Sequence, residues 1–257
     1  MKTERFLPAE QLRPWVKAFL IIHSEEGMVN RILPDTSIVM AFRCRGNVHY
    51  VDESTKTPLS TSVLTGLRST LRHVEYTAET TVLLILFQAG GAAALLKEPV
   101  HKLFDTSVPL DQLMPRWMIT ETEEQLAEVV TNSQRVAIVE QFLLKRLINN
   151  VEDELVKEAV RRIQLAKGVT RINDLVNGLA ISQDPFEKRF RRIVGTSPKQ
   201  FSEIVRLRSL IHQHSATQSL TETAYLAGYY DQAHFIKTFK HFTGQAPNLF
   251  FRTGRFW

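Results

Sequence analysis

The amino-acid sequence predicts an α+β fold, in which an antiparallel β-rich part comes first and an all-α part follows. Between about residues 31 and 88, short runs of β-branched and aromatic residues are separated by turn residues, a pattern typical of antiparallel strands. Helical periodicity takes over near residue 120 and continues toward the C-terminus. With 257 residues, of which 44% are hydrophobic, the chain has room for two domains that each bury a core.

Five runs in the first part predict the strands of an antiparallel sandwich or barrel-like domain. Pro34-Asp35 and Arg45-Gly46-Asn47 supply turns, and the apolar run 82–87 predicts the most buried strand. A helix-prone stretch, 92–97, follows the last run. The predicted strands are 38–43, 46–51, 62–66, 73–77 and 81–88.

Two amphipathic helices are predicted after the β runs. Thr120 and Glu123 have the spacing of a capping box, which predicts a helix start there. A second helix over 133–149 carries an apolar stripe that packs on the β part or faces a second copy of the chain. We favour packing within the chain, because buried stripes are usually satisfied there. The stripe consists of Val136, Val139, Leu143 and Leu147.

A domain boundary is predicted at Asn149-Asn150, which divides the chain into an N-terminal domain, 1–150, and a C-terminal domain, 151–257. A new helix starts at Val151 and stops at Gly168, a natural helix terminator. The second domain is predicted to be all α. Its further helices are expected at about 171–179, 183–194, 198–212, 220–227, 232–242 and 247–252.

An internal repeat lies in this second domain, because residues 182–201 recur 49 residues later. Each copy predicts a helix N-cap, two phenylalanines four residues apart that anchor the helix, a glycine at its end and a proline that opens the next helix. The matched pairs are Ser182 and Asp231, Gln183 and Gln232, Phe186 and Phe235, Lys188 and Lys237, Phe190 and Phe239, Arg191 and Lys240, Gly195 and Gly244, Pro198 and Pro247, and Phe201 and Phe250.

The second copy contains the parts of a helix-turn-helix, which needs a support helix, a tight turn and a second helix with an exposed face. Ser219 and Glu222 form a capping box at the start of the support helix, and Gly228 allows the positive φ that the turn requires. Asp231 caps the second helix. The first copy has Leu179 where the second has Gly228. The fold class is therefore α+β with two helix-turn-helix units in the all-α domain.

The basic charge of the chain is concentrated in the repeated part. Residues 161–257 contain 15 Lys and Arg against 6 Asp and Glu, whereas residues 1–160 contain 17 against 21. Because neutralised phosphates supply most of the sequence-independent affinity for nucleic acid, a basic helix-turn-helix domain predicts double-stranded DNA as its partner. The alternatives are a solvated basic face for the charge and a bundle for protein docking for the repeat.

The segment from Ala224-Tyr-Leu-Ala-Gly228 through Phe239 to Pro247, supported by Phe186 to Pro198, resembles the signature of AraC/XylS-type transcriptional regulators. The resemblance covers residues 155–252 and implies two helix-turn-helix units, joined by a long helix at 198–212, that read successive major grooves ~34 Å apart. It implies base contacts from Asp184, Glu187 and Lys188 in the first unit and from Gln232, Ala233, Ile236 and Lys237 in the second.

Phosphate contacts are assigned to four basic residues near these helices, Arg191, Arg192, Lys199 and Lys240. Two of the residues implied to contact bases in the first unit are acidic. Their carboxylates repel phosphate unless one of them accepts a hydrogen bond from a cytosine amino group.

The N-terminal part is similar to the small β domains that precede this module in some bacterial regulators, through Leu7-Pro8, Ile32-Leu33-Pro34-Asp35 and Phe87-Gln-Ala-Gly-Gly91. The resemblance implies that this part binds a small-molecule effector, holds a homodimer, or does both. It also implies RNA polymerase as a partner in transcription activation. No residue pattern singles out an effector-binding residue.

No catalytic residue, metal site or cofactor is predicted. Cys44 has no second cysteine, and the histidines of the first half form no close pair of the kind that holds a metal in a barrel. The longest apolar run is too short to cross a bilayer and the first residues lack the apolar stretch of a secretory signal, so we expect a cytoplasmic protein without a membrane partner. The alternative functions are a β-barrel enzyme fused to a DNA-binding module and a constitutive regulator whose N-terminal domain only dimerises.

Overall fold

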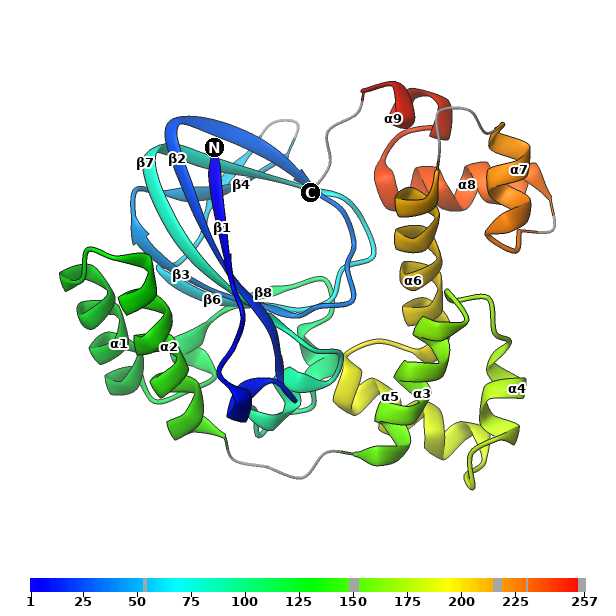
Figure 1. Cartoon of the computed structure of the whole chain (residues 1–257), viewed down its shortest axis with the longest axis horizontal. Helices are drawn as coiled ribbons and strands as arrows, with labels where there is room; N and C mark the ends of the chain where they lie inside the picture. The colour runs from blue at the N-terminus through cyan, green and yellow to red at the C-terminus, as the bar shows by residue number, and fades with distance from the viewer. Residues whose placement is uncertain (53–54, 148–152, 215–218, 230, 254–257) are drawn as a thin grey trace.

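Figure 1 shows the computed structural model of the chain, which describes residues 1–52, 55–147, 153–214, 219–229 and 231–253. A strongly curved β-sheet with helices beside it forms the N-terminal part, and helices alone form the C-terminal part (Figure 1). The predicted α+β fold is therefore confirmed. The predicted boundary at Asn149-Asn150 lies outside the described residues.

The described strands form one eight-stranded sheet with β7 (Arg72–Phe87) near its middle. Along one edge β7 pairs with β2 (Val16–Ile32), and along the other it pairs with β3 (Val39–Arg45) and β4 (Val48–Val51). Most of the sheet is thus assembled on this one strand. The remaining strands are β1 (Lys2–Phe6), β5 (Lys56–Pro58), β6 (Ser62–Thr65) and β8 (Ser107–Pro109).

Three of the predicted strands, 38–43, 46–51 and 62–66, correspond to β3, β4 and β6. The predicted strands 73–77 and 81–88 are one continuous strand, β7, because Glu79 adopts a φ of 55° without ending the pairing with β2. The sequence pattern does not predict β2. Its residues 18–22 are apolar on both faces of the strand, so they show no alternation.

Two helices, α1 (Arg116–Glu128) and α2 (Asn132–Arg146), lie beside the sheet. The capping box predicted from Thr120 and Glu123 is wrong, because α1 already begins after Pro115 and both residues lie inside it. Proline suits the start of a helix, where no backbone donor is needed. The capping box of this region belongs to α2, where the Thr131 side chain and Gln134 exchange hydrogen bonds.

The apolar stripe of α2 packs within the chain, as the sequence predicts. Val139 and Leu143 are fully buried, and the Phe142 ring packs edge-on against Phe42 of β3 with 5.6 Å between ring centroids. The helix-prone stretch 92–97 forms only a short 3-10 helix, η2. The 3-10 helices are η1 (Glu10–Leu12), η2 (Gly91–Ala94), η3 (Val100–Leu103) and η4 (Leu110–Gln112).

The C-terminal helices agree with the predicted ones to within about three residues at either end. The helix predicted from Val151 is observed from Glu154, and Gly168 follows its last turn with a φ of 74°. No described helix has the length and apolarity that are needed to cross a bilayer. The helices are α3 (Glu154–Leu165), α4 (Ile172–Asn177), α5 (Gln183–Val194), α6 (Pro198–Gln213), α7 (Leu220–Leu226), α8 (Gln232–Thr243) and α9 (Pro247–Thr253).

The two repeat copies belong to different hydrophobic cores. Phe186 and Phe190 of α5 lie in the same core as the sheet residues Phe42 and Phe87, so the first copy shares the core of the N-terminal part. The second copy has a core of its own, to which the N-terminal part contributes Leu33. The first copy is therefore fixed to the sheet by buried packing, whereas the second is carried mainly by α6.

Candidate functional site

The second helix-turn-helix unit consists of α7, α8 and the turn between them. Ser219 Oγ accepts a hydrogen bond from the Glu222 backbone N–H at 3.2 Å, and Glu222 Oε2 accepts one from the Ser219 N–H at 2.9 Å, which completes the predicted capping box. These hydrogen bonds from Ser219 lower the pKa of Glu222. Gly228 has the predicted positive φ, 74°, and Asp231 Oδ1 accepts from the His234 N–H at 2.7 Å.

The first unit, α4 and α5, reaches the same shape with a different turn. Gly178 ends α4 with a φ of −90°, and the half-buried Leu179 packs against the core, so this turn needs no left-handed residue. Ser182 occupies the N-cap position of α5, but its side chain makes no capping hydrogen bond. The side-chain cap expected in both copies is thus present only in the second.

The two turns predict different responses to an added methyl group. Gly228→Ala should lower the free energy of unfolding by about 1–2 kcal/mol, because an L-residue pays that much for a left-handed conformation and the new Cβ lies 2.9 Å from Val169 Cγ1. Gly178→Ala is the matched control: its φ is ordinary, and the nearest atom to the new Cβ is Arg162 Nη1 at 2.3 Å, the far end of a flexible side chain that can shift. Urea unfolding checks both variants, and equal stabilities would contradict this reading of the Gly228 turn.

The helices α5 and α8 are anchored in the same way. In α5 the rings of Phe186 and Phe190 lie 5.7 Å apart, and Phe190 also packs against Phe201 of α6. In α8 the matching rings, Phe235 and Phe239, lie 5.6 Å apart, and Phe239 packs against the repeat counterpart of Phe201, Phe250 of α9. Burial of the i and i+4 phenylalanines on one side leaves the opposite side of each helix to solvent.

The residues implied to contact bases lie on that solvent side. Ile236 is 37% exposed, so its side chain is accessible to a partner. Glu187 is half-buried, because its carboxylate accepts from Gln183 Nε2 at 3.0 Å and lies 3.7 Å from Arg191 Nη2. The other six are exposed: Asp184, Lys188, Gln232, Ala233, Ile236 and Lys237.

The four residues assigned to phosphates, Arg191, Arg192, Lys199 and Lys240, are all exposed, although Arg191 also contacts Glu187 within α5. The sequence does not distinguish these from basic residues that serve the fold. Arg189 pairs with Asp153 at 2.5 Å and Arg206 donates to the Gly168 carbonyl. Two more arginines, Arg161 and Arg162, hold the pKa of Glu158 at about 2.

The loop between β2 and β3 joins the N-terminal part to α6. Leu33 is buried among Leu207 and the phenylalanines of the second unit, and Asp35 pairs with Arg208 of α6 at 3.2 Å. Ile38, at the end of this loop, also lies beside the end of α5, because a Cβ placed on Gly195 would stand 3.6 Å from Ile38 Cδ1. Both helix-turn-helix units therefore touch the same loop.

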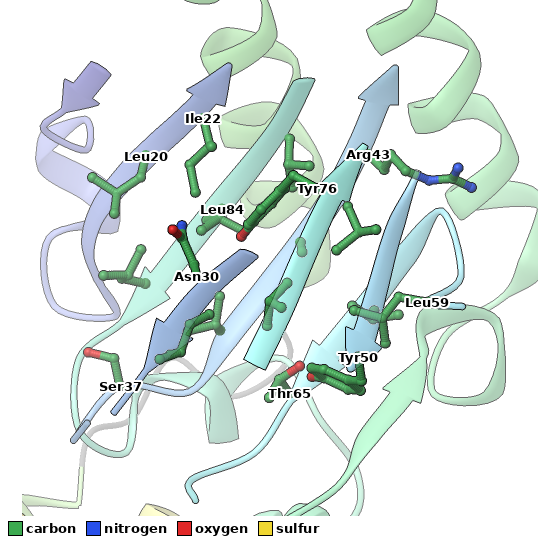
Figure 2. Close-up of a pocket in the computed structure, with 18 of the residues that line it drawn as sticks. Leu20, Ile22, Asn30, Ser37, Arg43, Tyr50, Leu59, Thr65, Tyr76 and Leu84 are labelled. Atoms are coloured by element: carbon green, nitrogen blue, oxygen red, sulfur yellow. The ribbon is translucent and has the colours of Figure 1, made fainter. Parts of the chain in front are cut away.

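The concave side of the sheet holds a cavity of about 230 Å³. Figure 2 shows apolar side chains on its wall, among them Leu20 and Ile22 of β2 and Leu84 of β7, and the polar residues Tyr50 and Thr65 at one end. The β2–β3 loop contributes further lining residues, Leu33, Asp35 and Ser37. One loop thus lines the cavity and contacts the C-terminal helices. No group of three His, Cys, Asp or Glu side chains suited to a metal lies within the described segments.

Comparisons with known proteins assign a type to the C-terminal part. Residues 175–253 match the family model of a helix-turn-helix domain. Residues 4–109 match the model of a domain of unknown function, DUF6597. A search of the curated proteins finds no match.

Among solved structures, the chain is similar to ToxT from Vibrio cholerae, with 12% sequence identity and a TM-score of 0.47 over 97% of this chain and 98% of that one. It is also similar to the AraC-like transcriptional activator CuxR, with 11% identity and a TM-score of 0.30 over 88% of this chain and 91% of that one.

Proposed function

We propose, from the premise that this chain is a DNA-binding transcription regulator with an AraC-type helix-turn-helix domain, that α5 and α8 read two successive major grooves. The observation that carries this proposal is the repeated placement of an exposed polar face opposite a buried phenylalanine pair in both helices. Such a face can enter a major groove, while the buried pair keeps the helix in a fixed orientation.

The length of α6 supports this spacing. Its 16 residues extend over roughly 24 Å at 1.5 Å per residue, and α5 precedes it while α7 and α8 follow its other end (Figure 1). Because α5 and α8 lie beyond the two ends of α6, half of a ~10 Å helix diameter is added at each end. The axes of α5 and α8 are then ~34 Å apart, which is one turn of DNA.

The proposal includes the residue roles. Asp184, Glu187 and Lys188 contact bases from α5, and four residues of α8 contact the next groove: Gln232, Ala233, Ile236 and Lys237. Phosphates are neutralised by Arg191, Arg192, Lys199 and Lys240. Internal pairing of Glu187 with Gln183 and Arg191 supports this assignment, because it reduces the repulsion between α5 and the DNA backbone.

The proposed class of protein, its location and its protein partners follow from DNA as the partner. The chain acts as a regulator rather than an enzyme, in the cytoplasm of a bacterial cell, with RNA polymerase and a second copy of itself as protein partners. Residues 1–150 form the sensing and dimerisation domain and residues 151–257 the DNA-binding domain. A selection of bound DNA from a random library tests the assembly, because a palindromic site indicates a dimer and a single asymmetric site a monomer.

Gel-shift titration of the full chain against a selected site, at several salt concentrations, tests DNA binding itself. With four phosphate contacts the slope of log K against log[salt] should be about −3.6. Binding that is absent, or that does not weaken as salt rises, would contradict the proposed function.

Lys237 and Lys240 provide a matched pair on one helix. Lys237→Ala should cost about 1–3 kcal/mol on the preferred site and relax the preference at one base pair, because a lysine on guanine reads sequence. Lys240→Ala should lower the affinity for all DNA sequences alike, because a phosphate contact carries no sequence information. It should also reduce the slope of log K against log[salt] by about one. Titrations on the selected site and on single-base variants measure both, and a uniform loss for Lys237→Ala would reassign that residue to phosphate.

The N-terminal domain, in the same proposal, binds a small effector that alters the DNA affinity. The support is the cavity in the sheet and its shared loop with α6, where Asp35 pairs with Arg208. Bound ligand stabilises the folded chain by mass action, so a thermal-shift screen of small metabolites tests sensing. A constitutive regulator with a dimerisation-only domain would show no shift with any of them.

A further inference from the structure

The turn between α3 and α4 lies between the two helix-turn-helix units. It is fixed to the first unit, because buried residues of α3, α4 and α5 share one hydrophobic core. A Cβ placed on Gly168 would stand 2.8 Å from the Arg206 backbone nitrogen, so this turn lies against the backbone of α6. Beside it, Val169 Cγ1 would stand 2.9 Å from a Cβ placed on Gly228, in the turn of the second unit. The α3–α4 turn thus touches both α6 and the second unit.

The side chain of Arg206 joins the two sides of this contact. Its Nε and Nη2 both donate to the Gly168 carbonyl oxygen, at 3.2 and 2.8 Å. The same guanidinium stands 5.3 Å from the centre of the Tyr229 ring, which follows Gly228 in the second unit. Tyr229 is buried, and its ring lies 5.3 Å from that of Phe235, the first anchor of α8. We call Gly168, Arg206 and Tyr229 the Arg206 joint, because their contacts run from the first unit to the second recognition helix.

This joint suits an arginine better than any other side chain. A guanidinium is planar, so it can donate from its edge to a carbonyl while it is attracted to the face of an aromatic ring. Burial raises the pKa of Tyr229 to about 12, so the ring is neutral and attracts Arg206 through its π face. The ion pairs between described residues do not include Arg206, so the joint is where its charge is engaged.

We propose that Arg206 is a positioning residue, which holds the second recognition helix at a fixed distance and rotation from the first and so sets the DNA spacing that the chain accepts. Helices as long as α6 curve, so a helix alone leaves the angle between two units soft, whereas a contact beside its axis resists bending and rotation. The proposal rests on the proposed function, because spacing matters only to a chain that reads two grooves.

A change of one base pair is a sharp test of such a joint. It alters the separation of two DNA segments by about 3.4 Å and turns one against the other by about 35°. Two units that are rigidly joined cannot follow this change, so one of the readers loses its contacts with the bases. Units that are loosely joined can follow it and keep both sets of contacts.

Gel-shift titration of the full chain on the selected site, and on the same site with one base pair inserted or removed between its two segments, tests this role. The measured quantity is the spacing ratio, which is the affinity for the selected site divided by the affinity for an altered one. The wild-type ratio should be about tenfold or more, because misplaced contacts with several bases are lost together. Arg206→Met should lower the ratio to about threefold or less. A loss of folded protein lowers all affinities alike, so a merely structural role would leave the ratio unchanged.

Three further variants complete the comparison. Arg206→Lys should give an intermediate ratio, because an ammonium keeps the charge and a donor but lacks the planar edge. Tyr229→Leu should lower the ratio, because it removes the ring and keeps an apolar side chain. Arg162→Gln is the matched control, with the wild-type ratio expected, because Arg162 donates to the Gly178 carbonyl within the first unit. A wild-type ratio in Arg206→Met, or in Tyr229→Leu should Arg206→Met not fold, would overturn the proposal, and so would a wild-type chain indifferent to spacing.

Pulsed electron resonance on the chain without DNA separates this proposal from the proposed function. Spin labels on Asp174→Cys in α4 and Thr221→Cys in α7, both exposed, report the distance between the two units in a Cys44→Ser chain. The distance distribution should be broader in Arg206→Met than with Arg206, and equal widths would overturn the proposal. A joint that narrows the distribution in a chain that binds no DNA would remove the proposed function and the role in spacing, and leave the contact itself standing. DNA binding with an unchanged spacing ratio in Arg206→Met would leave the proposed function standing and remove the role of Arg206.

Discussion

Phe239→Ala should unfold the second helix-turn-helix unit and abolish the tight binding of DNA. The ring is 1% exposed and packs against Phe235, Phe250 and Phe251 with centroid separations of 5.6, 5.0 and 5.6 Å. Removal of a buried phenylalanine ring costs about 3–5 kcal/mol, a large fraction of the roughly 5–15 kcal/mol that stabilises a whole domain. Because this core is separate from that of the sheet, the loss should be confined to the second unit.

Urea unfolding followed by circular dichroism, together with gel shifts, measures this effect. The expected result is an early transition for the second unit and a nearly unchanged later one for the rest. Ile236→Ala is the matched control on the same helix: it is 37% exposed, so stability should change by less than about 0.5 kcal/mol while the base preference of α8 changes. A Phe239→Ala chain as stable as wild type would show that the second core is not what holds α8.

The triple replacement Gln232→Ala, Ile236→Ala and Lys237→Ala should remove the second reader without unfolding it. Each good base contact contributes about 1–3 kcal/mol, so the summed loss of three contacts should be on the order of 3–9 kcal/mol, or roughly 10²- to 10⁶-fold in affinity. All three side chains are exposed, and the buried pair Phe235 and Phe239 is unchanged. The DNA site should shrink to the segment that α5 reads.

The mirror variant in the first unit, with Asp184, Glu187 and Lys188 changed to alanine, is the control for that result. It should lose preference in the other half of the site and keep it in the half that α8 reads. Two triple variants that lose the same half, or that retain full preference in both halves, would contradict independent reading by α5 and α8.

The C-terminal half was predictable from sequence because its signals are local. Asp231 caps α8 within three residues of the bond it makes, and Gly195 and Gly244 end the two recognition helices with φ values of 99° and 72°. The repeat doubled each signal, so the bounds of α5 to α9 differ from the predicted ones by at most one residue. The exposed faces followed from the phenylalanine spacing alone.

Features that depend on distant residues were not predictable. The strand β2 is stabilised by its long pairing with β7, about fifty residues further on, and its own sequence lacks alternation. Thr120 and Glu123 have a suitable spacing, but Pro115 starts the helix first. The sequence around Leu33 predicts an ordinary loop, yet Leu33 is buried in the core of the second helix-turn-helix unit.

The candidate sites show the same limit. Charge counts identify the basic half, but only the fold shows that Arg189 pairs with Asp153 and Arg208 with Asp35. Arg68 lies in a segment without any motif, and only the fold places it beside the cavity. Local patterns thus predict which helices read DNA, and packing decides which charges remain available.

Hydroxyl-radical footprinting of the full chain on a site selected from random DNA tests the two-groove reading most directly. Two protected segments about ten base pairs apart, on one face of the duplex, are predicted from the ~34 Å separation of α5 and α8. A single protected segment, or two segments on opposite faces of the duplex, would contradict it.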